Sequence, residues 1–207
     1  QVIVVGGGPV GAGLAVELGL RGISCALIER RPDLHRIPKG QNLHPRTLEH
    51  FYRWGIVDAL RAERIMPPGY PISGITAYGN LMSEYWFAPP QREIVRPYYF
   101  QAPERLPQYL TEKVLRAKVA TLRDVESRFG WTAEAIEQDE KSVRVTIAGP
   151  GGERDILTAD YVVGCDGARS AVREQIGIAR GGADFDQLMV LAVFRSRDLH
   201  EGLKRFP

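Results

Sequence analysis

Apolar runs and an amphipathic segment alternate along the N-terminal part of the chain. Val2–Val5 is continuous and β-branched, which is typical of a short strand buried on both faces. After a glycine-rich turn, Pro9 favours the first turn of a helix that ends at Gly22. Apolar residues recur in this segment at helical spacing, at Val10, Leu14 and Leu18. Ser24–Ile28 is the next expected strand, so the pattern predicts a right-handed βαβ unit.

The following part of the chain is less regular. Arg30–His44 contains two prolines and a Lys-Gly pair with little periodicity, which favours a loop. Pro45 then begins a helix that we expect to end at Trp54. Between residues 67 and 103, aromatic and alternating runs lie between prolines and glycines, and we expect strands of a second layer inserted into the first domain. These runs are Ile72–Tyr78, Glu84–Ala88 and Ile94–Phe100.

The second half of the chain predicts a helix, a β-meander and a strand–turn–helix unit. The helix covers residues 107–119. Three β-prone runs then predict the meander, namely Asp124–Phe129, Thr132–Glu137 and Val143–Ile147. The strand Leu157–Gly164 leads into an Asp-Gly pair, and Ser170 is a good N-cap for a helix that ends near Ile176. Leu188–Phe194 has the composition of one more strand.

These elements predict an α/β fold. We expect a Rossmann-type domain with a parallel sheet and a β-meander, together with part of an antiparallel sheet from a second domain. The run Leu188–Phe194 has no partner strand in the sequence that follows it. We therefore expect the chain to be the N-terminal part of a longer protein.

Composition narrows the class of protein. The 207 residues include 27 Lys and Arg against 25 Asp and Glu, so the net charge of +2 gives no reason to expect nucleic acid or an anionic membrane as partner. The longest apolar stretch is interrupted by glycines and a glutamate, so no membrane span is expected. Two cysteines in apolar runs favour a reduced, cytoplasmic protein. The four histidines lack metal-ligand spacing, so no metal site is expected.

The turn Gly6-Gly7-Gly8-Pro9-Val10-Gly11 matches the G-x-G-x-x-G pattern of dinucleotide-binding proteins. In that pattern Gly6 permits the tight turn, Gly8 lets the backbone approach a pyrophosphate, and Gly11 lets the helix pack closely on the strand. The phosphates then face free N–H groups at the helix N-terminus. The alternative is a glycine-rich turn that binds no ligand.

Glu29 stands at the end of the second predicted strand. There its carboxylate can accept hydrogen bonds from both hydroxyls of an adenosine ribose. A carboxylate at this place disfavours a 2′-phosphate, so the adenosine should belong to FAD or NAD rather than to NADP. Arg30 and Arg31 follow directly. We include Arg30 among the expected cofactor-binding residues, the alternative being that both arginines are solvated charges beside the site.

A second motif runs from Val162 to Arg173 and contains Asp166-Gly167. A buried strand that ends in Asp-Gly and continues into a capped helix places a carboxylate at the carboxyl edge of a sheet, where open α/β folds bind ligands. The alternative is that Asp166 only caps the following helix.

The two motifs together resemble those of the single-component flavin-dependent aromatic hydroxylases, the family of p-hydroxybenzoate hydroxylase and phenol hydroxylase. The resemblance implies that the glycine turn binds the FAD pyrophosphate and that Asp166 contacts the flavin ribityl chain. Two further segments are similar to that family, Asn42–Glu49 and Leu106–Leu115. They imply that Arg46 lies beside FAD and that Gln108 reaches the ribityl chain.

The resemblance implies a function and a division of the chain. The function is hydroxylation of a phenolic or similar aromatic substrate, with NADH or NADPH reducing FAD and O2 supplying the oxygen. Residues 1–66 and 104–180 are then an incomplete FAD-binding domain, and residues 67–103 and 181–207 are part of a substrate-binding sheet. Neither a catalytic residue nor the oligomeric state follows from the sequence. The alternatives are an NAD-binding dehydrogenase and a non-catalytic flavin-binding module.

Overall fold

The computed structural model describes residues 1–37, 39–65, 75–77, 85–87 and 96–182, together with residues 190, 196, 198 and 201. Its centre is a parallel sheet with the strand order β11-β1-β2-β7. In this sheet β1 pairs with β11 on one side and with β2 on the other, and β2 pairs with β7. The four strands are β1 (Val2–Val5), β2 (Cys25–Glu29), β7 (Val125–Phe129) and β11 (Tyr161–Gly164).

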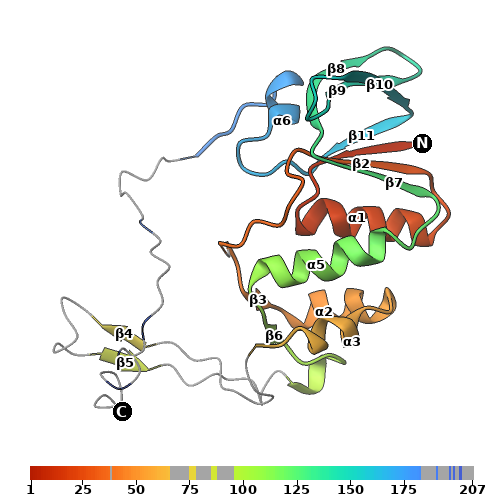
Figure 1. The fold of residues 1–207 in the computed structure, drawn as a ribbon. Coiled ribbons are helices and arrows are strands. Elements are labelled where there is room, and N and C mark those ends of the chain that lie inside the picture. The colour runs from red at the N-terminus through yellow and green to blue at the C-terminus, as the bar shows by residue number, and fades with distance from the viewer. Residues whose placement is uncertain are drawn as a thin grey trace.

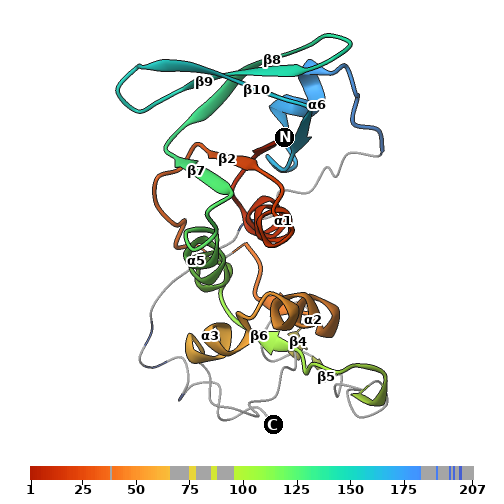
Figure 2. The same ribbon diagram turned by 90° about the vertical axis from the view of Figure 1, so that its right-hand side faces the viewer.

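Both faces of the central sheet are covered, which explains the unbroken apolar run of β1. Val4 packs with helix residues in one buried cluster, whereas Ile3 and Val5 pack with residues of the β-meander in another. Successive side chains of a strand point to opposite faces, so a strand covered on both sides needs apolar residues throughout. Figures 1 and 2 show the resulting layers: α1 and α5 lie on one face of the sheet and the meander lies on the other.

Helices α1 and α5 lie side by side against the sheet, and α2 and α3 lie beyond them (Figure 2). The bounds are α1 (Pro9–Leu20), α2 (Pro45–Arg53), α3 (Val57–Ala62), α5 (Gln108–Val119) and α6 (Ala171–Gln175). Small residues form the buried face of α1, namely Gly11, Ala12, Gly13, Ala15 and Val16. Val10, which begins the apolar spacing noted in the sequence, is 73% exposed and lies outside this face. Helix α3 was not predicted.

The structure contains a β-meander, as expected, but one of its three strands differs from those predicted. It is the sheet β10-β9-β8, with β8 (Thr132–Gln138), β9 (Val143–Ala148) and β10 (Arg154–Ala159). The expected first meander strand is β7, which follows a helix and therefore joins the parallel sheet beside β2. The predicted strand Leu157–Gly164 is divided between β10 and β11, because the chain changes sheets at Asp160.

Short antiparallel pairs complete the described fold. β3 (Asn42–Leu43) pairs with β6 (Glu104–Arg105), which places a short strand inside the predicted loop Arg30–His44. β4 (Ile75–Ala77) pairs with β5 (Tyr85–Phe87), in agreement with two of the expected inserted strands. Of the third, Ile94–Phe100, residues 96–100 are described, and they begin with the 3-10 helix η1 (Arg96–Tyr98). The expected strand Leu188–Phe194 falls, except for Val190, outside the described residues.

Candidate functional site

A cavity of about 340 Å³ opens where β1, β2 and β11 end and α1 begins. It lies at the carboxyl edge of the parallel sheet, which is where ligands bind in open α/β folds. The walls come from the glycine turn, the segment after β2, the start of α5, the first half of β8 and the start of α6. Residues lining the cavity include Gly6, Gly7, Gly8, Pro9, Val10, Glu29, Arg30, Gln108, Trp131 and Asp166.

The three glycines of the motif meet three different demands. Gly6 has φ +106°, a backbone conformation that L side chains rarely adopt, and a Cβ there would overlap the backbone of Cys165. A Cβ on Gly11 would overlap the carbonyl oxygen of Gly6, so this glycine permits the close approach of α1 to the turn. By contrast, a Cβ on Gly8 would meet no atom within 4 Å. The fold therefore needs Gly6 and Gly11, whereas the space beside Gly8 is open to a ligand.

The N-terminus of α1 points at this open space. Gly8 is the N-cap, and no side chain caps the helix. The first backbone hydrogen bond of the helix runs from Ala12 N–H to the carbonyl of Gly8, so the N–H groups of Val10 and Gly11 have no partner within the helix. Free N–H groups and the positive end of the helix dipole attract phosphate. The site is therefore suited to a pyrophosphate.

Glu29, the last residue of β2, supports the glycine turn from the other side of the cavity. Its Oε2 accepts a hydrogen bond of 2.7 Å from Gly7 N–H, and its Oε1 accepts one of 2.9 Å from Arg31 N–H. An ionised carboxylate has about four acceptor sites, so two remain for ribose hydroxyls. The sequence predicted the ribose role but not the bond to Gly7.

Asp166 occupies the turn between β11 and α6. Its Oδ1 accepts a 2.5 Å hydrogen bond from Ser170 Oγ, and its Oδ2 accepts one of 3.2 Å from Val172 N–H. Ser170 in turn accepts a bond from Arg173 N–H at 3.0 Å, which confirms it as the N-cap of α6. Asp166 therefore stabilises the start of α6 as well as lining the cavity, so the two alternatives considered for it are compatible.

The remaining predicted residues divide into two groups. Arg30 and Gln108 line the cavity, and Gln108 Nε2 donates a 2.6 Å hydrogen bond to Glu112. Arg46 is not among the lining residues; its side chain is 67% exposed and forms a 3.0 Å ion pair with Glu49. The structure thus brings together all the predicted cofactor-binding residues except Arg46 and the buried Gly11.

Several residues that shape the cavity were not predicted. Arg116 of α5 donates a 2.9 Å hydrogen bond to the carbonyl of Pro32, so it holds the segment after Glu29. Its guanidinium carbon lies 4.2 Å from the ring centre of Phe129. Gln175 of α6 lines the cavity and bonds β8 twice: Ile136 N–H donates to its Oε1 at 2.8 Å, and its Nε2 donates to the carbonyl of Glu134 at 3.1 Å. No local motif marks either residue, because both contacts join distant parts of the sequence.

Burial disfavours the thiolate form of both cysteines. Burial raises the pKa of the Cys25 thiol to about 11, and burial together with the nearby Asp166 carboxylate raises the pKa of Cys165. Among the residues that the structure describes, no group of His, Cys, Asp and Glu side chains is placed to hold a metal ion. Within the same ranges, no helix has the length and apolar character needed to cross a membrane.

The sequence comparison decides the family. Residues 1–205 match the family described as "FAD binding domain". The chain belongs to the class A FAD-dependent aromatic hydroxylase family. The residues of the cavity fit the cofactor of this family: the open space at Gly8 faces an uncapped helix N-terminus, and Glu29 retains acceptor sites for a ribose.

Curated relatives of this family member include a hydroxylase and a monooxygenase. It is 30% identical over 97% of its length to a 3-(3-hydroxy-phenyl)propionate/3-hydroxycinnamic acid hydroxylase of Burkholderia vietnamiensis. It is also 30% identical over 90% of its length to pentachlorophenol 4-monooxygenase of Sphingobium chlorophenolicum. The chain covers 35% and 33% of these two proteins, so it spans about a third of their length.

Solved structures give the same assignment. The flavin-dependent monooxygenase PieE, in complex with FAD and substrate, superposes with a TM-score of 0.79 at 30% identity over 88% of this chain and 33% of PieE. Aklavinone-11 hydroxylase with FAD and aklavinone superposes with a TM-score of 0.76 at 29% identity, over 86% of this chain and 34% of that protein. The predicted α/β fold, with its Rossmann-type FAD domain and meander, is confirmed.

Proposed function

We propose that this protein is the FAD-binding part of an NAD(P)H-driven monooxygenase that hydroxylates a phenolic or similar aromatic substrate with O2. The observation that carries the proposal is the open space at Gly8, in front of the uncapped N-terminus of α1 and within the wall that Glu29 completes. The names of the relatives, which include hydroxylases and monooxygenases of phenolic compounds, support the substrate class.

The residues of the chain would divide the binding of FAD between them. The N–H groups at the start of α1 would hold the pyrophosphate, and Glu29 would accept hydrogen bonds from the adenosine ribose. Asp166 and Gln108 would orient the ribityl chain, each already held by a partner of its own, Ser170 and Glu112 respectively. FAD, once reduced, supplies the activation of O2 that protein side chains cannot provide.

The overall reaction follows from the balance of atoms and electrons. One atom of O2 would enter the aromatic ring as a hydroxyl group and the other would leave as water, with the two electrons coming from NADH or NADPH. The glycine turn and Glu29 fix the adenosine half of the cofactor, so they act at a distance from the reacting ring. We expect the protein to work in the cytoplasm, where NAD(P)H is available and where Cys25 and Cys165, both free thiols here, stay reduced.

A direct experiment separates this proposal from its alternatives. The purified protein is titrated with FAD and with NAD+, and NAD(P)H oxidation, O2 uptake and product are then measured over a panel of phenols. The proposal predicts tight FAD binding by this chain, and substrate-dependent O2 uptake with hydroxylated product by the full-length protein. Binding of NAD+ in preference to FAD would identify a dehydrogenase. Binding of FAD without NAD(P)H oxidation by the full-length protein would identify a non-catalytic flavin-binding module.

A further inference from the structure

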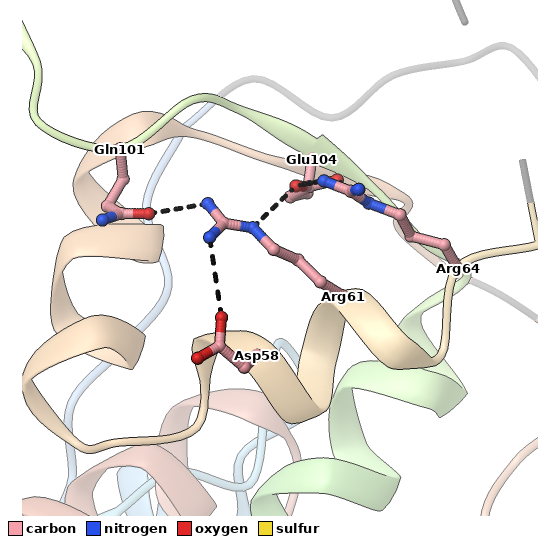
Figure 3. Close-up of polar contacts among 5 residues, drawn as sticks. All are labelled: Asp58, Arg61, Arg64, Gln101 and Glu104. Atoms are coloured by element: carbon pink, nitrogen blue, oxygen red, sulfur yellow. Dashed lines mark hydrogen bonds and ion pairs between the residues drawn. The ribbon is translucent and has the colours of Figure 1, made fainter. Parts of the chain in front are cut away.

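A nearly buried carboxylate lies outside the cavity, on the short strand β6. Glu104 is 7% exposed and lies between two arginines of the α3 segment, as Figure 3 shows. Arg61 Nε donates to Glu104 Oε1 at 3.2 Å, and Arg64 Nε donates to Oε2 at 2.9 Å, with a second Arg64 contact to Oε1. A carboxylate buried to this extent needs charged partners, and here it has two.

Neighbouring side chains extend this cluster in both directions. Arg61 Nη2 donates a 2.7 Å hydrogen bond to Gln101 Oε1, and Arg61 Nη1 lies 3.9 Å from Asp58. Gln101 is itself 7% exposed, so the chain just before β6 is also held against α3. The cluster therefore fixes the segment 101–104 to α3 through side chains alone.

The strand that carries Glu104 leads directly to the cavity. β6 pairs with β3, and the pairing continues past both strands: Leu106 N–H donates to Gln41 O at 2.8 Å, and Gln108 N–H donates to Gly40 O at 2.9 Å. Gln108 and Lys39 line the cavity. One end of this ribbon is thus held by the ion cluster, and the other end forms part of the cavity wall.

The ribbon is too short to hold its own position. Only Asn42 with Arg105 and Leu43 with Glu104 are paired within the strands, and isolated two-stranded ribbons are marginal in water even when they are longer. Its place must come from the groups around it, which include the buried Leu106, the partly buried Leu43 and the ion cluster at Glu104. A shift at Glu104 would therefore be passed along the ribbon to Gly40 and Gln108.

We propose that Glu104 is a positioning residue for the flavin half of the FAD site, acting through the β3–β6 ribbon on Gln108. This proposal rests on the proposed function, since it assumes that the cavity holds FAD with Gln108 beside the ribityl chain. Glu104 does not line the cavity; its effect is to hold the ribbon that leads into α5, so that Gln108, the first residue of α5, lies where its amide can meet the cofactor.

The test compares FAD with ADP, which lacks the flavin half. In Glu104→Gln the neutral amide removes the negative charge that Arg61 and Arg64 share, and Arg61 keeps only Asp58 at 3.9 Å, so the ribbon should move from α3. We expect FAD affinity to fall about tenfold, the equivalent of one lost hydrogen bond, while ADP affinity stays as in the wild type. The visible spectrum of bound FAD should also shift, because the surroundings of the flavin change. An equal loss of ADP and FAD affinity, or none, would overturn the proposal.

A double variant tests the route through Gln108. If Glu104 acts by positioning Gln108, then Glu104→Gln combined with Gln108→Ala should bind FAD no more weakly than Gln108→Ala alone. Additive losses of FAD affinity would contradict the proposal and indicate a general effect on stability. Wild-type protein that fails to bind FAD at all would instead refute the proposed function, so the two failures are distinct.

Two milder variants and a control distinguish a positioning effect on FAD affinity from unfolding of the protein. Arg64→Gln keeps the ion pair of Arg61 with Glu104, so it should weaken FAD binding less than Glu104→Gln does. Arg64→Lys keeps the positive charge and should restore the FAD affinity of the wild type. Lys113→Ala removes the exposed 2.7 Å ion pair between α5 and Glu63 without touching the ribbon. FAD affinity should be unchanged in this control. Equal FAD affinity in the wild type and Arg64→Gln, with a lower melting temperature, would show a structural role only and overturn the proposal.

Discussion

The carboxylate of Glu29 and the backbone of Gly7 are joined by a hydrogen bond of 2.7 Å. This bond links the end of β2 to the glycine turn that follows β1, so the group expected to hold the ribose also holds the loop expected to hold the pyrophosphate. A Cβ on Gly7 would approach Glu29 Cβ to 2.7 Å, which shows how closely the two segments pack. The two parts of the motif, far apart in sequence, form one structural unit.

Replacing Glu29 should therefore affect the cofactor in two ways. In Glu29→Lys the ribose loses its acceptors, at about 1.5–3 kcal/mol for each hydrogen bond to a charged group, and the turn loses its bond to Gly7. We expect FAD affinity to fall by several orders of magnitude in a flavin fluorescence titration. Glu140→Lys, at an exposed position in the meander, makes the same change of charge and should leave the affinity as it is. Unchanged affinity in Glu29→Lys would rule out the ribose assignment.

The glycines should respond differently to a side chain. Gly8 has φ −68° and open space around it, so Gly8→Val should fold but block the pyrophosphate. Gly11→Ala would overlap Gly6 O and should instead lower the melting temperature of the apo-protein. Circular dichroism and gel filtration with FAD distinguish the two outcomes. A folded Gly8→Val protein that still carried FAD through the column would contradict the pyrophosphate assignment.

Asp166 should contribute to both stability and binding. Because Asp166 accepts a hydrogen bond from Val172 N–H, Asp166→Ala should lower the free energy of unfolding of the apo-protein by about 0.5–2 kcal/mol. Ser170→Ala is the control, since it removes the neighbouring cap without a group in the cavity. Because Ser170 also donates a hydrogen bond to Asp166, FAD affinity should fall much less in Ser170→Ala than in Asp166→Ala, and an equal fall in both variants would leave Asp166 with a capping role alone.

The buried thiol of Cys25 should make stability depend on alkaline pH. Burial raises its pKa to about 11 in the folded protein, whereas the thiol in the unfolded chain titrates near its ordinary pKa of 9.0. The unfolded state therefore loses its proton first, and the free energy of unfolding should fall as the pH rises from about 9 to 11. Urea unfolding at both ends of this range should show a larger fall in the wild type than in Cys25→Ala. Equal slopes would show that Cys25 does not contribute.

The N-terminal βαβ unit could be predicted because its signals are local. Val2–Val5 and Ser24–Ile28 differ from the observed strands by at most one residue, and the glycine turn lies where its spacing predicted. The partner of β7 could not be predicted. β7 is an edge strand of the parallel sheet. Its sequence alternates like that of an antiparallel strand, because one side of β7 is less covered. The pairing of β7 with β2 depends on where the preceding helix, α5, ends in space.

The candidate site was predictable in the same way, motif by motif. The glycine turn, Glu29, Gln108 and Asp166 meet at one cavity, as expected. The supporting contacts were not predictable, since Arg116 to Pro32 and Gln175 to Glu134 join residues whose separation in sequence carries no pattern. Arg46 shows the opposite case: it lies in a motif that resembles the family, yet its side chain pairs with Glu49 away from the cavity.

Titration of the purified protein with FAD tests the central claim most directly. The account predicts that FAD binds with its absorption and fluorescence altered, and that ADP competes for the same site because the glycine turn and Glu29 recognise the adenosine half. It further predicts that Gly8→Val abolishes both FAD and ADP binding in a folded protein. Failure of the wild-type protein to bind FAD, or FAD binding that ADP does not displace and Gly8→Val does not weaken, would contradict it.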